Sequence, residues 1–301
     1  MNNKHTENTL RKQTRDFSKL TTTATAEDWA HAAGMDWHVY EAAITYHPSG
    51  LNAEPAMAYG GMKVLYRSDN CAPLSIVPAS FLAPQPIDTF AYYKRFAEFY
   101  ELRPRAAGEL KGGKLWWCML DANLPATAID ESTLNSMLLL STECDAAFPA
   151  TLVATCMVST SETLLPGFYL ETPPVRIPLS AEFLPPSSLT EIGNAIGQCA
   201  MLTNFLASLT TVRVNESVAL QYYRTLLQLH DESRKTRNVN KQLKELLEKR
   251  AQTAWALLRT FAQHVDARSR RRGDDGLYFR WFGAGFEAKR EALRLSVEMF
   301  G

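Results

Sequence analysis

The 301-residue sequence lacks long apolar segments. Its uninterrupted apolar runs are short, for example Leu115–Leu120 and Met137–Leu140. A helix needs roughly 20 apolar residues to cross a bilayer, so we expect no transmembrane helix. The beginning of the chain is positively charged but has no apolar segment behind the charges, which argues against a secretory signal. The sequence therefore predicts a protein with no membrane partner.

Cysteine is scarce and shows no pairing pattern. The five cysteines are widely spaced, their number is odd, and no CxxC motif occurs. Disulfide frameworks and structural zinc sites both require closer or paired cysteines, so neither is expected. Reduced thiols in the cytoplasm are the simplest interpretation. The cysteines are Cys71, Cys118, Cys144, Cys156 and Cys199.

Motifs of the common enzyme classes are also missing, because neither HExxH nor GxSxG occurs. Gly108–Lys114 has the glycine and lysine spacing of a phosphate-binding loop. However, Leu115 stands where that loop needs Ser or Thr, and the following LWWCML is typical of a strand. We therefore expect a glycine hairpin here, with no nucleotide or other cofactor and no metal site. Whether the protein is an enzyme stays open, and a non-catalytic role is favoured.

The order of predicted elements gives the fold class. Period-two patterns dominate the first part of the chain and helical periodicity follows Pro185–Ser188, which favours an α+β fold over alternating α/β. We expect a flexible basic tail at 1–25, a mixed or antiparallel sheet domain at 26–182 and a helical domain at 187–301. The predicted strands are 37–46, 63–68 and 74–77 as one hairpin around Asp69-Asn70, 105–121 as a second hairpin, 134–141, 150–159 and 174–180, with a Pro/Gly-rich loop at 48–61. The predicted helices are 27–33, 86–101, from 188 to about 209, 215–230, 238–267 and 285–299, with a loop at 269–276.

Four segments resemble an uncharacterised phage/plasmid-like protein family, the domain of unknown function numbered nine-three-two. In Lys63–Gln85, YRSDN, LSIV and SFLAPQP are similar to the family's Arg-Ser-Asp run, Leu-x-x-Val strand and Gln before a helix. Gly108–Gly113 resembles its glycine-rich hairpin. Thr253–Asp266 looks like its Thr-x-Trp…Asp segment, although Arg259 replaces a preferred Asn. Phe282–Ala292 resembles its Gly-x-Gly…Lys…Ala ending. The resemblance implies a mobile-element context and no known activity.

Charge is strongly segregated although the whole chain is neutral. Residues 213–301 carry 18 Lys/Arg against 11 Asp/Glu, whereas residues 21–212 carry 9 against 19. A positive end on a neutral protein indicates a polyanionic partner. The densest cluster consists of Arg268, Arg270, Arg271 and Arg272, whose guanidinium groups match phosphate oxygens. The alternative is a solvated loop that the following acidic turn partly neutralises.

Two further features extend this candidate nucleic-acid surface. Lys289, Arg290 and Arg294 lie on neighbouring turns of the last predicted helix, where the alternative is pairing with acidic residues of the same helix. Trp116 and Trp117 are adjacent in a predicted strand, so they project to opposite faces. On a sheet with one covered face, one of them, assigned as Trp117, would be exposed and could stack on bases.

These features favour a nucleic-acid-associated protein of a phage, plasmid or other mobile element, with single-strand DNA binding or annealing as the most concrete version. One alternative is a metal-dependent enzyme acting on nucleic acid, with ligands among Asp69, Asp121, Asp274 and Asp275. Another is a protein–protein adaptor. The sequence leaves the oligomeric state open, so a homo-oligomer remains an alternative to a monomer.

If Arg268, Arg270, Arg271 and Arg272 contact phosphates, binding to nucleic acid should weaken steeply with salt. About four contacts imply a log–log slope near −3 to −4 on duplex DNA and a shallower one on single strands. Replacing all four with Ala should flatten this slope without affecting folding, because the cluster lies in a polar loop. A salt series of electrophoretic shifts measures both slopes, and an unchanged slope in the variant would contradict the assignment.

Overall fold

The computed structural model describes eleven stretches of the chain, and all structural statements refer to them. Each strand pairing whose register these residues define is antiparallel. The described stretches are residues 15–17, 20, 24–47, 55–145, 150–161, 163–166, 175–177, 186–227, 244, 252–268 and 273–301.

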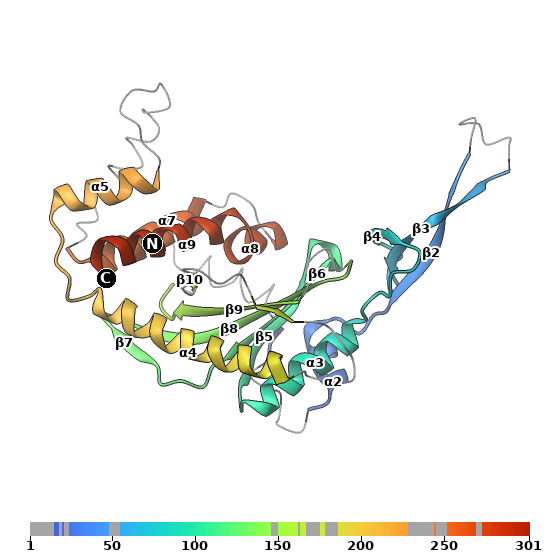
Figure 1. Ribbon diagram of the computed structural model, residues 1–301, viewed down its shortest axis with the longest axis horizontal. Coiled ribbons are helices and arrows are strands. Elements are labelled where there is room, and N and C mark those ends of the chain that lie inside the picture. The colour runs from blue at the N-terminus through green and yellow to red at the C-terminus, as the bar shows by residue number, and fades with distance from the viewer. Residues whose placement is uncertain are drawn as a thin grey trace. The chain divides into compact units, whose positions relative to one another are not determined.

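Strands dominate the chain before residue 178 and helices dominate it from residue 186, so the α+β prediction is confirmed (Figure 1). The strands are β1 (Arg15–Asp16), β2 (Val39–Tyr46), β3 (Met57–Arg67), β4 (Pro73–Pro78), β5 (Arg103–Leu110), β6 (Leu115–Asp121), β7 (Thr127–Ile129), β8 (Ser132–Glu143), β9 (Ala150–Val158), β10 (Thr163–Pro166) and β11 (Val175–Ile177). The helices are α2 (Ala26–Ala33), α3 (Pro86–Phe99), the short η1 (Lys111–Gly113), α4 (Pro186–Ser208), α5 (Glu216–Leu226), α7 (Ala254–Arg268), α8 (Asp274–Trp281) and α9 (Ala284–Phe300).

The strands form two sheets. The larger has the order β1-β5-β6-β8-β9-β10, with β7 paired to β8 and β11 paired to β9. The smaller consists of β2, β3 and β4 in that order, and Figure 1 shows β2 and β3 as a long twisted ribbon. The β3–β4 and β5–β6 hairpins that the sequence predicts are therefore confirmed.

The chain divides into two compact units, each assembled from separate segments. Unit 1 comprises Met1–Leu120, Leu139–Leu152 and Val175–Thr190, and unit 2 comprises Asp121–Leu138, Val153–Pro174 and Glu191–Gly301. The predicted change at Pro185–Ser188 is real at the level of secondary structure, because α4 begins at Pro186. It does not coincide with the division into units, since unit 2 combines the C-terminal helices with strands such as β10.

Local signals explain where the helices of unit 1 begin and end. The Thr25 hydroxyl accepts a hydrogen bond from the backbone of Asp28, whose carboxylate accepts one from the backbone of Thr25, a capping box that starts α2. Gly34 ends this helix in the left-handed conformation. Pro86 occupies the first turn of α3, where its missing N–H is not needed. Helices α2 and α3 pack against each other, and α2 also packs on β5.

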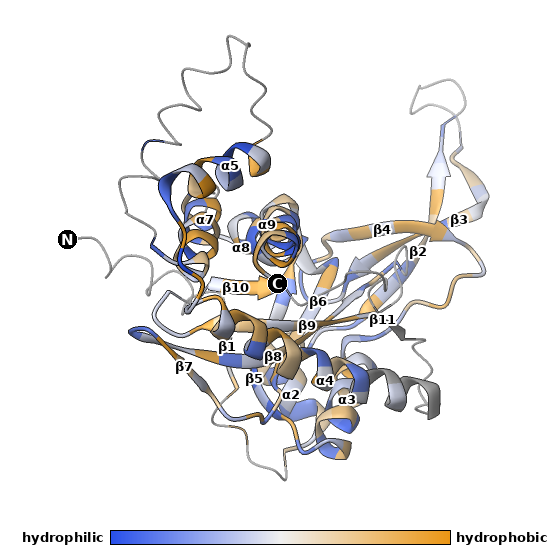
Figure 2. Cartoon of the chain, turned by 60° about the vertical axis from the view of Figure 1, so that its left-hand side comes forward, coloured by the Kyte–Doolittle hydropathy of each residue, from blue (hydrophilic) through white to orange (hydrophobic). Residues whose placement is uncertain are grey.

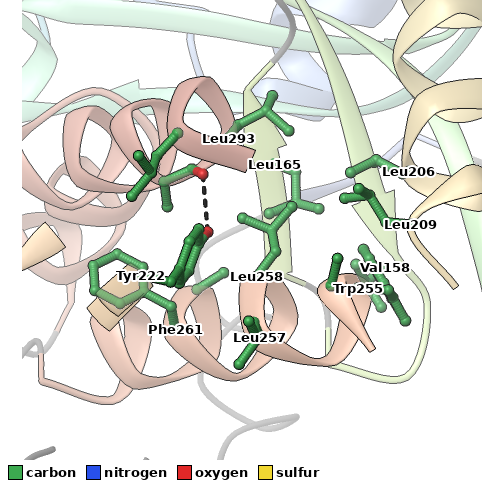
Figure 3. Packing of buried hydrophobic residues seen from close by; sticks show 14 of the residues in the cluster. Val158, Leu165, Leu206, Leu209, Tyr222, Trp255, Leu257, Leu258, Phe261 and Leu293 are labelled. Atoms are coloured by element: carbon green, nitrogen blue, oxygen red, sulfur yellow. Dashed lines mark hydrogen bonds between the residues drawn. The ribbon is translucent and has the colours of Figure 1, made fainter. Parts of the chain in front are cut away.

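The core of unit 2 forms where α4, α5, α7 and α9 meet strands of the larger sheet (Figure 3). The α7 and α9 helices carry both hydrophobic and hydrophilic residues along their length, as Figure 2 shows, so each buries one side and exposes the other. Tyr222 lies fully buried and donates its hydroxyl hydrogen bond to the carbonyl of Ala292 or to Ser296. The residues labelled in Figure 3 are Val158, Leu165, Leu206, Leu209, Tyr222, Trp255, Leu257, Leu258, Phe261 and Leu293.

Three sequence predictions of local structure were wrong. The loop predicted at 48–61 is shorter, because β3 already begins at Met57. The helix predicted at 238–267 is not continuous, because Thr253 pairs with Arg213 as an isolated β-bridge and α7 begins at Ala254. The loop predicted at 269–276 includes the start of α8. Helical periodicity could not reveal the bridge, since its partner lies forty residues earlier in the chain.

The described helices contain no segment that is both long and apolar enough to span a bilayer.

Lys289 and Asp266 form a buried ion pair in unit 2. The Lys289 ammonium lies 2.9 Å from Asp266 Oδ1, and its side chain is fully buried. Burial lowers the pKa of Lys289, and the Asp266 carboxylate counteracts part of this effect. The pair joins α7 to α9, which are the segments that carry two of the family-like motifs.

Lys289→Met should destabilise unit 2 by about 3–5 kcal/mol, because it leaves the Asp266 carboxylate without its cation. The matched control is Arg290→Met, which breaks only a surface pair with Glu287 and should cost less than about 1 kcal/mol. Adding Asp266→Leu to Lys289→Met should restore most of the loss. Urea unfolding of the full chain measures all three effects, and equal midpoints for the two single variants would refute the assignment.

Candidate nucleic-acid interface

The three-stranded sheet of unit 1 has two different faces. Tyr40 lies opposite Tyr66, and Val64 lies opposite both Ala42 and Ile76. Residues directly opposite in antiparallel strands project to the same side, and alternate residues of one strand share a side. These rules define an outer face made of Tyr40, Ala42, Val64, Tyr66 and Ile76, and an inner face made of Val39, Glu41, Lys63, Leu65, Arg67 and Val77. A register shift between Ala43 and Thr45 interrupts the alternation, and Tyr46, Met57 and Tyr59 lie beyond it on the extension of the β2–β3 ribbon.

The outer face and the extension of the ribbon are aromatic and open to solvent. Tyr40 on the outer face is 49% exposed, and Tyr46 and Tyr59 on the extension are 46% and 55% exposed. The Tyr40 and Tyr66 rings meet edge to face with their centres 5.9 Å apart, and the His38 ring stacks on Tyr40 at 6.4 Å. No charged side chain belongs to the outer face as defined. Exposed apolar surface of this kind is typical of a binding surface.

The inner face is covered at Val39, Leu65 and Val77, which are all buried. Glu41 and Lys63 lie on the same side and form an ion pair with each other. Arg67 is buried beside the three apolar residues although it is charged. Its guanidinium group forms a two-bond pair with the Asp69 carboxylate, from Nε to Oδ1 at 2.9 Å and from Nη2 to Oδ2 at 2.8 Å. A buried charge needs such pairing to offset the loss of hydration.

Arg67 also connects this sheet to the β5–β6 hairpin. Its Nη1 atom donates to Glu109 Oε1 at 2.6 Å, and Glu109 Oε2 accepts from the Trp37 indole N–H at 3.1 Å. The guanidinium carbon lies 4.2 Å from the centre of the Trp37 ring, a cation–π contact. Burial works against the charged form, but the hydrogen bonds that Arg67 donates to the Asp69 and Glu109 carboxylates outweigh it and raise the pKa of Arg67. The Arg67 hydrogen bond lowers the pKa of Asp69.

The turn between β5 and β6 is shaped to receive Arg67. Lys111, Gly112 and Gly113 all have positive φ angles, of 55°, 67° and 96°. The Gly112 carbonyl lies 3.5 Å from Arg67 Nη1, and the Gly113 carbonyl accepts a hydrogen bond from the Trp116 indole at 2.7 Å. A Cβ atom on Gly113 would lie 3.0 Å from Arg67 Nη1 and 3.1 Å from the Trp37 ring. Glycine is therefore required for close approach as well as for backbone conformation.

The Gln85 side chain hydrogen-bonds to the edge strand β2. Its Oε1 accepts the Val39 backbone N–H at 2.9 Å, and its Nε2 donates to the Val39 carbonyl at 3.1 Å. The amide thus imitates a neighbouring strand for one residue and satisfies backbone groups that an edge strand would leave unpaired. The two family-like sequence features around Arg67 and Gln85 therefore both serve to hold this sheet.

The structure places the predicted basic residues differently from one another. Arg268 ends α7 and is exposed, whereas Arg270, Arg271 and Arg272 lie outside the described residues. Arg290 pairs with Glu287, and Arg294 pairs with Glu291 and Glu298. The alternative of pairing within the helix is thus what the structure has. Lys289 is fully buried and has no surface for a phosphate to contact.

The tryptophan that the sequence predicts to be exposed is not exposed. Trp116 and Trp117 are both fully buried. Both faces of β6 are covered, so the assumption of a sheet with one open face was wrong at this strand. The Trp117 ring lies under Gly108, where a Cβ atom would be 3.4 Å away. Trp117 therefore cannot stack on bases in this arrangement.

The acidic residues considered as metal ligands do not gather into one site. Asp69 is bound by Arg67, Asp121 accepts the backbone N–H of Asn123, and Asp274 and Asp275 lie in the first turn of α8. Within the part of the chain that the structure describes, no three His, Cys, Asp or Glu residues lie close enough to hold a metal ion together. The Gly108–Lys114 motif is a strand hairpin, as predicted.

Comparison with known protein families, with curated proteins and with solved structures finds no match for this chain. The resemblance to the phage/plasmid-like family therefore stays a prediction.

Sequence reasoning missed the outer face because glycine and proline between 48 and 61 were taken to indicate a loop. The signal was present, since tyrosine occurs twice in VYEAAITY and twice again in MAYGGMKVLY. Read as one hairpin, the two segments place Tyr40 and Tyr66 opposite each other. The covered and open faces could not be told apart by period alone, because both carry apolar residues.

Gly113→Ala should destabilise unit 1 more than Gly112→Ala does. Both positions need a left-handed backbone, which costs roughly 1–2 kcal/mol for alanine. Only at Gly113 would the new methyl group press on Arg67 and Trp37, since nothing lies within 4 Å of the corresponding position at Gly112. We expect an additional loss of about 1–3 kcal/mol from overpacking, measured by urea unfolding. Equal losses in the two variants would show that the contact does not matter.

Proposed function

We propose that this protein binds single-stranded nucleic acid by stacking bases on the exposed tyrosines of its three-stranded sheet. The observation that carries the proposal is the set of half-exposed tyrosines, Tyr40, Tyr46 and Tyr59, along the β2–β3 ribbon. Proteins that bind single strands without strong sequence preference use aromatic side chains on which successive bases stack. Every base has a planar face, so this kind of contact needs no particular sequence.

The position of the tyrosines on a sheet supports this role. The β2–β3 ribbon continues beyond the part that β4 joins, and Tyr46, Met57 and Tyr59 lie on that extension. An extended surface suits a flexible strand better than it suits a compact small molecule. Tyrosine loses little conformational entropy when it forms such contacts, because only two side-chain angles are fixed.

The charge distribution supplies the second element of the proposal. The outer face itself carries no cation, so phosphate contacts must come from basic residues elsewhere in the chain. Residues 1–20 and 213–301 both have a net positive charge in the sequence. Binding would then combine stacking, which is insensitive to salt, with phosphate contacts, which are not. Strand annealing within a phage, plasmid or other mobile element is the context that the family resemblance favours.

The proposal predicts a specific effect of Tyr59→Ala. Removing this ring should weaken binding to a fluorescently labelled oligothymidine by about 1–3 kcal/mol, or roughly 5- to 150-fold in Kd. Tyr59→Phe keeps the ring and should bind like the unaltered protein. Phe99→Ala is the matched control, because Phe99 is an exposed aromatic residue of unit 1 that lies on α3. Fluorescence anisotropy measures all three affinities.

Duplex DNA of the same length should bind more weakly, since its bases are not available for stacking. Equal Kd values for Tyr59→Ala and the unaltered protein would overturn the stacking proposal. No binding of either DNA form by the unaltered protein would also overturn it, and would favour the adaptor alternative, in which the same apolar face meets a protein.

A further inference from the structure

A network of hydroxyl groups joins the beginning of β8 to the turn that follows β9 in unit 2. Ser132 and Thr133 are the first residues of β8, and Ser159 and Thr160 lie in the turn after β9. The Thr133 hydroxyl donates to Ser159 Oγ at 2.9 Å, and the Thr160 hydroxyl donates to Ser132 Oγ at 3.0 Å. The two serine oxygens lie 3.3 Å apart. The backbone N–H of Thr133 also donates to Ser159 Oγ, at 3.0 Å.

One hydroxyl proton of the network has no acceptor within the network. Thr133 and Thr160 each use their hydroxyl proton within the network, and the contact between Ser132 and Ser159 uses one more. Each hydroxyl carries a single proton, so one serine keeps a proton for which the described residues provide no acceptor. Ser161, in the same turn, has a buried hydroxyl oxygen with no hydrogen-bond partner among the described residues. Ser159 and Thr160 are exposed, so a ligand from solvent can reach the spare proton of the network.

Arg259 adds a positive charge to this network. It projects from α7, which packs against β10, and its Nη2 atom donates to Thr160 Oγ1 at 3.4 Å. Within the described stretches Arg259 has no carboxylate partner, unlike Arg290 and Arg294. A guanidinium group has five N–H donors, and this single long hydrogen bond uses only one of them. The remaining donors are available to a ligand.

Hydroxyl groups and one arginine therefore converge at this place, and no carboxylate takes part in the hydrogen bonds among them. The carboxylates nearest in sequence, Asp130 and Glu131, are exposed in the turn before β8 and do not take part in the network. Hydroxyl groups, backbone N–H groups and an arginine are the ligands that bind phosphate oxygens in proteins. A network that served only to join β8 to the turn after β9 would need no arginine. The Ser159 backbone N–H already donates to the Thr133 carbonyl at 2.9 Å and joins the two segments.

We propose that Arg259, Ser159 and Thr160 form a phosphate-binding site on unit 2. The Arg259 guanidinium would hold the charge of the phosphate, and the spare serine hydroxyl would donate one further hydrogen bond. The ligand is either a free phosphate group or a phosphodiester of a nucleic-acid backbone, which present the same oxygens. The site is independent of the stacking face and does not rest on the proposed function.

The test titrates the full chain with inorganic phosphate and, separately, with dimethyl phosphate, at constant ionic strength. Phosphorus NMR line widths report binding of each compound. Arg259→Gln should weaken binding about tenfold or more, because it removes a charge-assisted contact. Thr160→Val keeps the shape and removes the hydroxyl that positions Arg259, so it should weaken binding several-fold.

Arg224→Gln is the matched control, because Arg224 is an exposed arginine of α5 in the same unit and should leave phosphate affinity unchanged. Circular dichroism establishes that each variant is folded. If only inorganic phosphate binds in an Arg259-dependent way, the ligand is a free phosphate group. If dimethyl phosphate also binds, a nucleic-acid backbone is the ligand. Absence of binding to both compounds, or equal affinity in Arg259→Gln and the unaltered protein, would overturn the proposal.

Discussion

The Arg67 guanidinium group is the contact on which the three-stranded sheet of unit 1 depends. A small antiparallel sheet with one open face buries too little apolar surface to be stable alone. Arg67 compensates by joining the sheet to the β5–β6 hairpin through Glu109, Trp37 and the Gly112 carbonyl. Because these contacts all lie on the inner face, the outer face needs no covering element. The tyrosines of this sheet are exposed because the contacts of Arg67 lie on the opposite side.

The charges of the C-terminal region show why a net charge does not measure a binding surface. The sequence counts seven more cations than anions between residues 213 and 301. In the structure Lys289 forms a buried ion pair with Asp266, and Arg294 forms ion pairs with two acidic residues of its own helix. In the sequence Arg259 is distinguished only by replacing the Asn that the phage/plasmid-like family prefers. It has no acidic partner among the described residues and lies beside donors that a phosphate could use.

The aromatic residues also differ in exposure from what their spacing in the sequence indicates. Two adjacent tryptophans are the most conspicuous aromatic signal in the sequence, and both are core residues. The tyrosines of β2 and β3 are spread over 27 residues, Tyr40 to Tyr66, and become neighbours only through the strand register. A search for clustered aromatic residues therefore selects the wrong ones, since clustering in sequence and clustering on a surface are different properties of a sheet.

The sequence by itself determined the kind and order of the longer regular elements, whereas the short β1, β7 and β10 and the helix α8 were not predicted. Capping residues such as Thr25 and Asn215 act within one turn of helix, and the glycines of the β5–β6 hairpin act within one tight turn, so these signals can be read locally. Tertiary structure decided which faces are covered, which charges are paired and where α7 begins. The bridge from Arg213 to Thr253 and the hydrogen bonds of Arg67 with Glu109 join residues forty or more positions apart. Burial depends on such distant partners, and no periodicity within a single element contains that information.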